Sequence, residues 1–282
     1  LDPWATPQAY DNAKDFFDTG ITWSNSLNVA QMLEKSSYSI SLGNTHQDGI
    51  ISSTGMDRYN VKVSADTKLT SNWSSGFTAN YITTSIDKAV TSGNGLLRTV
   101  YAAPPSYDLA GIPSHVDGNP YTQNSFRGSF DNAYWAMENN KFTEDTNRFF
   151  GNVYTSYQTD FGTTNHKLNA KYMVGVDAYT THYVDSYGYG SNTGGGRGQI
   201  ENYGWTNATY NSLLTINYDW HINEDWGLNA VVGNEIIQSN RKKYYEYGTN
   251  YNFPGWNHIN NATTQQTEEE TWKNRTVGFF GN

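Results

Sequence analysis

Apolar and polar residues alternate along several stretches of this chain, and the alternation is clearest over residues 58–69. One set of alternate positions there is apolar, with Val61 and Val63 at its centre, whereas Ser64 belongs to the polar set. After a short turn at 70–72, the same alternation resumes over 73–81. A period of two predicts β-strands, and two such strands joined by a short polar turn predict an antiparallel hairpin.

The same pattern recurs and predicts about nine strands in one antiparallel, all-β sheet. The remaining predicted strands cover 22–30, 38–44, 149–161, 166–184, 208–220 and 226–238, and a last strand starts near Trp272. Short and long links alternate strictly between them. The short links are 31–37, 70–72, 162–165 and 221–225, and the long links are 45–57, 83–147, 185–207 and 239–271.

Alternation alone fits both a soluble sandwich, with apolar residues facing a core, and a transmembrane barrel, with an apolar band facing lipid. Three features favour the barrel. The predicted strands reach about 10 to 17 residues, against a usual mode near 5 or 6, and a tilted membrane strand needs about 9 to 11. Aromatic residues such as Phe161 gather beside the short turns, and the link lengths alternate. We therefore predict a segment of an antiparallel transmembrane β-barrel.

The link lengths also predict an orientation in the membrane. Outer-membrane barrels have short periplasmic turns and long extracellular loops, so 83–147, 185–207 and 239–271 are predicted to be extracellular. The first predicted strand then runs from the outside to the periplasm. A chain with a periplasmic N-terminus must first cross in the other direction, so we expect a strand before Leu1 and a continuation of the last strand past Asn282. Residues 1–282 are thus expected to be one part of a larger barrel domain.

Composition narrows the possible functions further. The 282 residues are 36% hydrophobic and 16% charged, with a formal net charge of −9 and no Cys. No run approaches the roughly 18 apolar residues of a membrane helix. The negative charge argues against nucleic acid as a partner. Without Cys, a disulfide scaffold, a thiolate metal site and a Cys nucleophile are excluded.

The sequence contains no convincing catalytic or metal-binding set. The pattern of residues 221–224 has a metal-like spacing but lies in a predicted turn, and a zinc site needs three or four convergent ligands. The glycines of 194–198 do not lie between a strand and a helix start, so we interpret them as a flexible loop and not a phosphate cradle. Asp177 and Glu235 fall on predicted polar faces and are expected to line the lumen. We expect no enzymatic activity, no metal and no cofactor.

Several motifs follow one another in an order that is typical of a known family. They are Tyr10-Asp11-Asn12, Phe16-Phe17-Asp18-Thr19-Gly20, Tyr38-Ser39-Ile40-Ser41-Leu42-Gly43-Asn44, Asp48-Gly49-Ile50-Ile51 and Met56-Asp57-Arg58-Tyr59-Asn60, with Asn119-Pro120-Tyr121 and Arg148-Phe149-Phe150-Gly151-Asn152 later. In this order they closely resemble the early barrel of SusC/RagA-like TonB-dependent outer-membrane transporters. The resemblance is strongest over 10–81 and covers most of the chain in order.

This resemblance implies a 22-stranded barrel occluded by an N-terminal plug and capped outside by a SusD-like lipoprotein. Such a barrel sits in outer-membrane lipid and imports glycans or peptides with energy from TonB. The present sequence contains neither a plug nor a TonB box, and roughly half or more of the implied barrel strands are missing. On this reading the chain is not expected to transport a solute alone.

Two groups of aromatic residues are the candidate functional residues. Aromatic rings stack on sugars and on amphipathic peptide groups, so aromatics in or beside the predicted loops are substrate-binding candidates, with loop packing or lipoprotein docking as the alternative. These are Trp135, Tyr187, Tyr189, Trp205 and Trp256. Aromatics on the strands are expected to anchor the barrel at the membrane interface. These are Trp73, Tyr81, Tyr172, Trp220 and Trp226.

Two other functions fit the same alternation. A secreted carbohydrate-binding or carbohydrate-cleaving β protein would fold in water without detergent. A passive porin would have no plug domain upstream. Neither the substrate nor the energy-coupling step can be identified in these residues.

Overall fold

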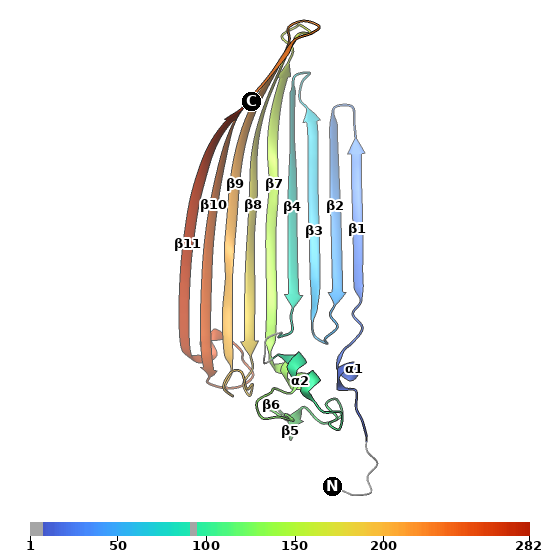
Figure 1. Cartoon of the computed structure of the whole chain (residues 1–282), viewed down its shortest axis with the longest axis vertical. Helices are drawn as coiled ribbons and strands as arrows, with labels where there is room; N and C mark the ends of the chain where they lie inside the picture. The colour runs from blue at the N-terminus through green and yellow to red at the C-terminus, as the bar shows by residue number, and fades with distance from the viewer. Residues whose placement is uncertain (1–7, 91–94) are drawn as a thin grey trace.

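The computed structural model describes residues 8–90 and 95–282, which form one large antiparallel sheet with a group of loops and short helices at one end (Figure 1). The strands follow one another across the sheet in chain order. They are β1 (Thr22–Met32), β2 (Ser36–Asp48), β3 (Gly55–Lys68), β4 (Trp73–Asp87), β7 (Lys141–Thr159), β8 (His166–Tyr187), β9 (Gln199–His221), β10 (Gly227–Tyr251) and β11 (Ala262–Gly281). The predicted all-β, antiparallel architecture is confirmed.

The period-two pattern gives the sheet two chemically different faces. Cross-strand partners share a face, and one continuous row of partners is Leu27, Leu42, Val61, Tyr81 and Phe149. Intervening positions are polar: the hydroxyl groups of Ser39 and Ser64 lie 2.8 Å apart. We call the face with Val61 the apolar face and the face with Ser64 the polar face.

The apolar face is exposed and is not the lining of a core. The side chains of Leu27 and Val29 are 58% and 56% exposed, and Val153 is 53% exposed. On β8 the apolar face runs from Leu168 to Ala178, which is about 33 Å along an extended strand and about 25 Å of height at the usual tilt of a barrel strand. That height equals the apolar band of an outer-membrane barrel.

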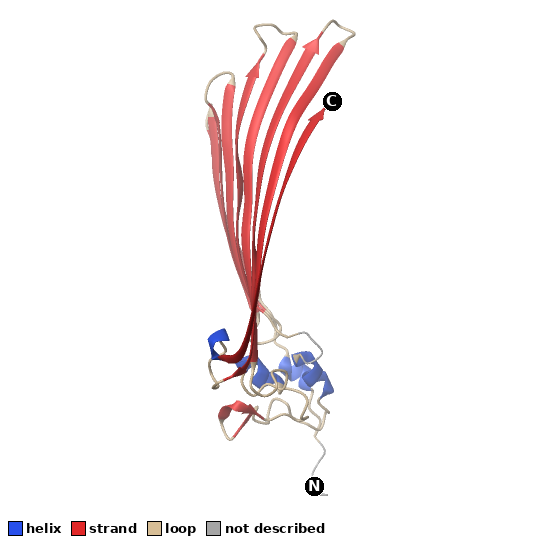
Figure 2. Cartoon of the chain, turned by 90° about the vertical axis from the view of Figure 1, so that its left-hand side faces the viewer, coloured by secondary structure: helices blue, strands red, loops and turns tan. Residues whose placement is uncertain are grey.

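Figure 2 shows the sheet from its edge, as a single twisted layer whose helices and irregular loops gather at one end. At the opposite end the strands are joined by the short turns 33–35, 69–72, 160–165 and 222–226. Among residues 8–90 and 95–282, no helix has the length and apolar character that crossing a membrane requires.

The strands extend further towards the loop end than the sequence predicted. The predicted link 185–207 shortens to 188–198, 239–271 shortens to 252–261, 83–147 shortens to 88–140, and 45–57 shortens to 49–54. The pairing continues unbroken to Thr249 opposite Gln199. Hydrophobic alternation fades here because polar and aromatic residues occupy both faces, although the backbone ladder continues.

The link 88–140 is folded and supplies most of the buried apolar residues. It contains α2 (Leu96–Ala102), β5 (His115–Val116), β6 (Asn119–Gln123) and α3 (Ala133–Asn139), and it packs against α1 (Asn12–Phe16) from the N-terminal segment. Its core consists of Phe16, Leu96, Val100, Leu109, Ala133, Trp135 and Ala136. A second small cluster holds Ile200, Tyr251 and Ala262 beside η1 (Ile259–Asn261).

Candidate functional site

Towards the loop end, the polar face of β7–β11 carries a continuous patch of aromatic side chains. Tyr183, Tyr203 and Tyr245 are direct cross-strand partners on β8, β9 and β10. The rings of Tyr183 and Tyr203 stack with centroids 4.8 Å apart and planes only 6° from parallel. Trp205 packs 5.6 Å from Tyr183. We call Tyr183, Tyr203, Trp205, Tyr245 and Trp272 the aromatic patch.

The chain places its own cations on aromatic rings along this same face. The Arg241 guanidinium lies between two rings of the aromatic patch, 5.3 Å from Trp205 and 5.6 Å from Trp272. The Lys88 ammonium lies 4.6 Å from the Tyr183 ring. Such contacts contribute about 0.5 to 2 kcal/mol each, depending on how far the cation is desolvated. The patch is therefore suited to cations as well as to ring stacking.

Asp177, predicted to line the lumen, lies on the polar face in an ion pair with Arg148. The Arg148 Nε and Nη2 atoms donate to the two carboxylate oxygens at 2.9 and 2.6 Å. The guanidinium also lies 4.9 Å from the Phe150 ring. Glu235 is on the same face of β10, further from the loops.

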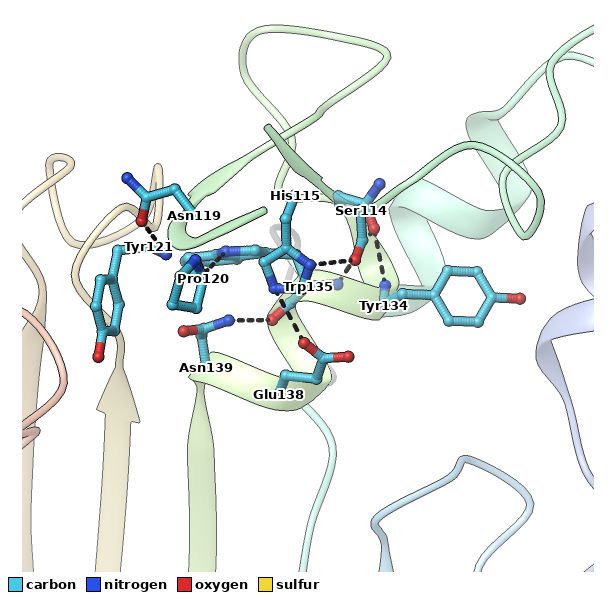
Figure 3. Close-up of polar contacts among 10 residues, drawn as sticks. Ser114, His115, Asn119, Pro120, Tyr121, Tyr134, Trp135, Glu138 and Asn139 are labelled. Carbon is cyan, nitrogen blue, oxygen red and sulfur yellow. Dashed lines mark hydrogen bonds and ion pairs between the residues drawn. The ribbon is translucent and has the colours of Figure 1, made fainter. Parts of the chain in front are cut away.

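Trp135 was predicted as a substrate contact, and the structure places it elsewhere. Its side chain is fully buried at the centre of the loop core. The indole Nε1 donates to the Pro120 carbonyl oxygen at 2.8 Å (Figure 3). Asn132, the N-cap of α3, accepts from the Trp135 backbone N–H. This residue has no surface to offer a ligand, so it positions the loop. Trp135 and the two alanines near it in α3, Ala133 and Ala136, are all buried.

Two half-buried tyrosines pack against the loop core. Desolvation raises the pKa of Tyr134, whose hydroxyl donates to the Asp15 backbone oxygen at 3.3 Å. Desolvation likewise raises the pKa of Tyr107. Both phenols are thus expected to stay protonated well above neutral pH.

The structure does not bring the other four candidates to one point. Trp205 is a strand residue of β9 in the aromatic patch, not a loop residue. Tyr187 is the last residue of β8, where its ring lies 5.2 Å from Phe142. Tyr189 packs against the cluster around Ile200 and Tyr251.

Trp256 is the most accessible of the loop candidates. It is 44% exposed and stacks between Phe253, at 5.8 Å, and His258, at 5.0 Å. The loop 252–261 that carries it is tied down by the Asn261 side chain, which donates to the backbone oxygens of Phe253 and Trp256 at 2.8 Å. These rings form a rigid aromatic platform at the loop end.

Hydrogen bonds join the loops 88–140, 188–198 and 252–261 into one cap. No pattern in the sequence predicted these contacts. The buried Asp131 carboxylate accepts from the Ser191 hydroxyl at 2.6 Å and from the Asn192 backbone N–H at 2.7 Å. The Asn257 side chain donates to the Asn139 backbone oxygen at 2.9 Å. Loops 88–140, 188–198 and 252–261 are therefore held together.

We expect Asp131→Ala to loosen this cap. It removes the acceptor for Ser191 Oγ and Asn192 N and should cost about 1.5 to 3 kcal/mol of local stability, because buried donors lose a charged partner. Hydrogen exchange should be faster across 188–198, whereas Asp160→Ala, in a short turn at the other end, should leave that loop unchanged. Equal protection of 188–198 in both variants would contradict the assigned role of Asp131.

Four of the predicted membrane anchors, Trp73, Tyr81, Trp220 and Trp226, lie near an end of the apolar face, whereas Tyr172 lies well inside it, two residues from Val174, and the anchoring role stays a prediction. Trp73, Tyr81, Tyr172 and Trp220 project from the apolar face and are 37–45% exposed, and Trp226, in the turn 222–226, is 70% exposed. Trp73 and Tyr81 are separated along β4 by about 26 Å, which at the usual tilt of a barrel strand is about 20 Å of height.

The described residues contain no group of three or more His, Asp or Glu side chains placed to hold a metal ion. The segment 221–224 spans the end of β9 and its turn, as predicted. Gly195, Gly196 and Gly198 adopt positive φ angles in the loop 188–198.

The nine-stranded fold is shared with a chain of the RagAB peptide importer. Its 'closed-closed' structure matches with a TM-score of 0.77 and 16% identity, over 97% of this chain and 31% of that chain. The 'open-open' structure matches with a TM-score of 0.76 and 13% identity, over 100% and 32%. The present chain thus spans about a third of the length of these chains. The sequence matches no protein-family model and no curated protein.

Identities this low show the fold alone. The structural match covers almost the whole chain. It therefore confirms, for the fold, the resemblance to SusC/RagA-like transporters that the sequence motifs indicated.

Proposed function

We propose that this chain forms part of the wall of a β-barrel that imports an oligomeric solute, a peptide or a glycan, across a bacterial outer membrane. The observation that carries the proposal is the pair of opposite faces. Nine adjacent strands expose an apolar surface with Leu27, Val61 and Val153 on one side and a polar surface on the other. Lipid outside and a water-lined lumen inside satisfy both faces.

The same proposal assigns a role to each end of the sheet. The short turns face the periplasm, and the linked loops 88–140, 188–198 and 252–261 face outward. The platform of Phe253, Trp256 and His258 offers a rigid aromatic surface there. In the proposed importer these loops meet a SusD-like surface lipoprotein, and TonB acts through a plug domain that is not among the strands described here. Tyr187, Tyr189 and Trp256 remain the candidate loop contacts.

The mechanism is passage and not catalysis. Solute would move along the polar face while the loops hold the lid and the ligand, and we assign no catalytic residue. A secreted sugar-binding protein is less well supported, because a soluble protein seldom exposes a contiguous apolar surface of this extent.

Cell fractionation and growth test the proposal. The product of the complete gene should sediment with outer membranes, and its deletion should abolish growth on the imported peptide or glycan as sole source, while growth on free amino acids or monosaccharides is unchanged. Recovery of the protein in a soluble, detergent-free fraction would contradict it. Unimpaired growth of the deletion strain on every oligomer tested would favour a structural or passive role.

A further inference from the structure

One row of the aromatic patch pairs each of its three tyrosines with a carboxylate. The Tyr203 hydroxyl donates to Asp185 Oδ2 at 3.1 Å. Glu144 of β7 is the direct cross-strand partner of Tyr183. Tyr245 lies directly opposite Glu268 of β11 and diagonally opposite Glu201 of β9. The three tyrosines therefore lie side by side between Glu144 and Glu268, with Asp185 and Glu201 in the adjacent row of the same face.

A lysine of the chain already occupies the first position of this row. The Lys88 ammonium lies 4.6 Å from the Tyr183 ring and 3.6 Å from Glu144 Oε2. This geometry combines a cation–π contact with an ion pair. It shows which kind of group the tyrosine–carboxylate unit accepts.

The adjacent row, one step closer to the loops, holds two carboxylates that have no lysine or arginine partner. Asp185 and Glu201 are direct cross-strand partners, and like charges placed opposite one another destabilise a sheet. In the part of the chain that the structure describes, no lysine or arginine forms an ion pair with either carboxylate or lies over the ring of Tyr203 or Tyr245. The nearest cation on that face of β10, Lys243, lies opposite Glu270 of β11.

These positions are open to a ligand. All four side chains, Asp185, Glu201, Tyr203 and Tyr245, are half-buried. They lie near the loop ends of β8, β9 and β10, on the polar face. Figure 1 shows these three strands side by side. A solute that enters past the loop cap would meet them before the remainder of that face.

We propose that Asp185, Glu201, Tyr203 and Tyr245 form a recognition site for the cationic side chains of a peptide, in the manner that Lys88 illustrates beside Tyr183. This inference rests on the proposed function, because it requires the polar face to line the path of the solute. The ligand's ammonium or guanidinium group would neutralise the opposed carboxylates and contact the two phenol rings. A glycan offers hydroxyl groups but no charge to compensate this pair.

The test uses two synthetic peptides of equal length that differ only in carrying lysine or glutamine at three positions. Binding to the purified product of the complete gene is measured by calorimetry in detergent at low salt. We expect the lysine peptide to bind about tenfold more tightly, a factor that corresponds to about 1.4 kcal/mol. Asp185→Asn with Glu201→Gln should remove this preference. Glu235→Gln is the matched control, because it removes a carboxylate from the same face of β10 about 33 Å away along the strand, and it should keep the preference.

A charge-reversal variant tests whether the lost preference for the lysine peptide could result from misfolding. Asp185→Asn combined with Glu201→Lys should turn the preference towards an otherwise identical glutamate peptide, a gain that no loss of structure can produce. Equal binding of the lysine and glutamine peptides to the unaltered protein would overturn the site and leave the proposed importer standing. An unchanged preference in the Asn/Gln variant would also overturn it. Failure to bind or import any peptide would overturn the site. If gene deletion also left growth on glycans unimpaired, that result would overturn the proposed function as well.

Discussion

Replacing Trp135 by Ala is expected to unfold the cap formed by the loop 88–140 while leaving the strands paired. The side chain is fully buried against Leu96, Val100 and Leu109. Removing a buried Trp costs about 3 to 5 kcal/mol through lost burial and a residual cavity. The loss should remain local, because the strands are held by their own ladders.

Hydrogen exchange by mass spectrometry would measure this effect, with α2 and α3 losing protection and β8 and β9 retaining theirs. Trp256→Ala is the matched control, since Trp256 is 44% exposed and its removal should leave α3 protected. Trp135→Phe should give an intermediate result, because it keeps most of the packing but loses the hydrogen bond to the Pro120 oxygen. Full protection of α3 in Trp135→Ala would show that this residue does not organise the cap.

Introducing Arg on the apolar face is expected to be the most damaging change within the strands. Val63 and Val174 lie near the middle of the apolar surface on β3 and β8. Arg at either position should cost about 2 to 4 kcal/mol, since a guanidinium near the centre of the bilayer loses its hydration. Arg at Ser64, on the polar face, should cost little because its charge stays in water.

Folding titrations of the complete gene product into liposomes, with urea as denaturant, would give these free energies. A matched pair, Val63→Arg and Ser64→Arg, differs by one residue along the same strand, so local strand propensity is nearly constant between them. Equal costs at Val63, Val174 and Ser64 would contradict the assignment of the two faces.

Much of the fold could be predicted from the sequence because a membrane strand must alternate wherever one face meets lipid. All nine strands, their order and the alternation of short and long links follow from that rule, and β3 and β4 are the clearest cases. On the proposed membrane location, this rule does not apply to the parts of the strands outside the bilayer, where both faces meet water. The strand ends after Val184, before Ala208 and after Gln238 were therefore missed.

The candidate site was harder to predict for the same reason. Tyr183 was included in a predicted strand, but its partners Tyr203 and Tyr245 lie in strand ends that were interpreted as loops, so their common row was invisible. Trp205 was placed in a loop for that reason too. The contacts of Asp131 with Ser191 and Asn192 link residues about 60 positions apart, and no local pattern encodes such a contact.

The central claim, that the apolar face meets lipid and the polar face meets water, can be tested most directly with single cysteines, because the chain has none of its own. Val63→Cys, Val174→Cys and Ser64→Cys are labelled with a bimane fluorophore in urea and refolded into vesicles whose lipids carry nitroxide on their acyl chains. We predict strong quenching at 63 and 174 and weak quenching at 64. Equal quenching at the three positions, or the strongest quenching at 64, would contradict the account.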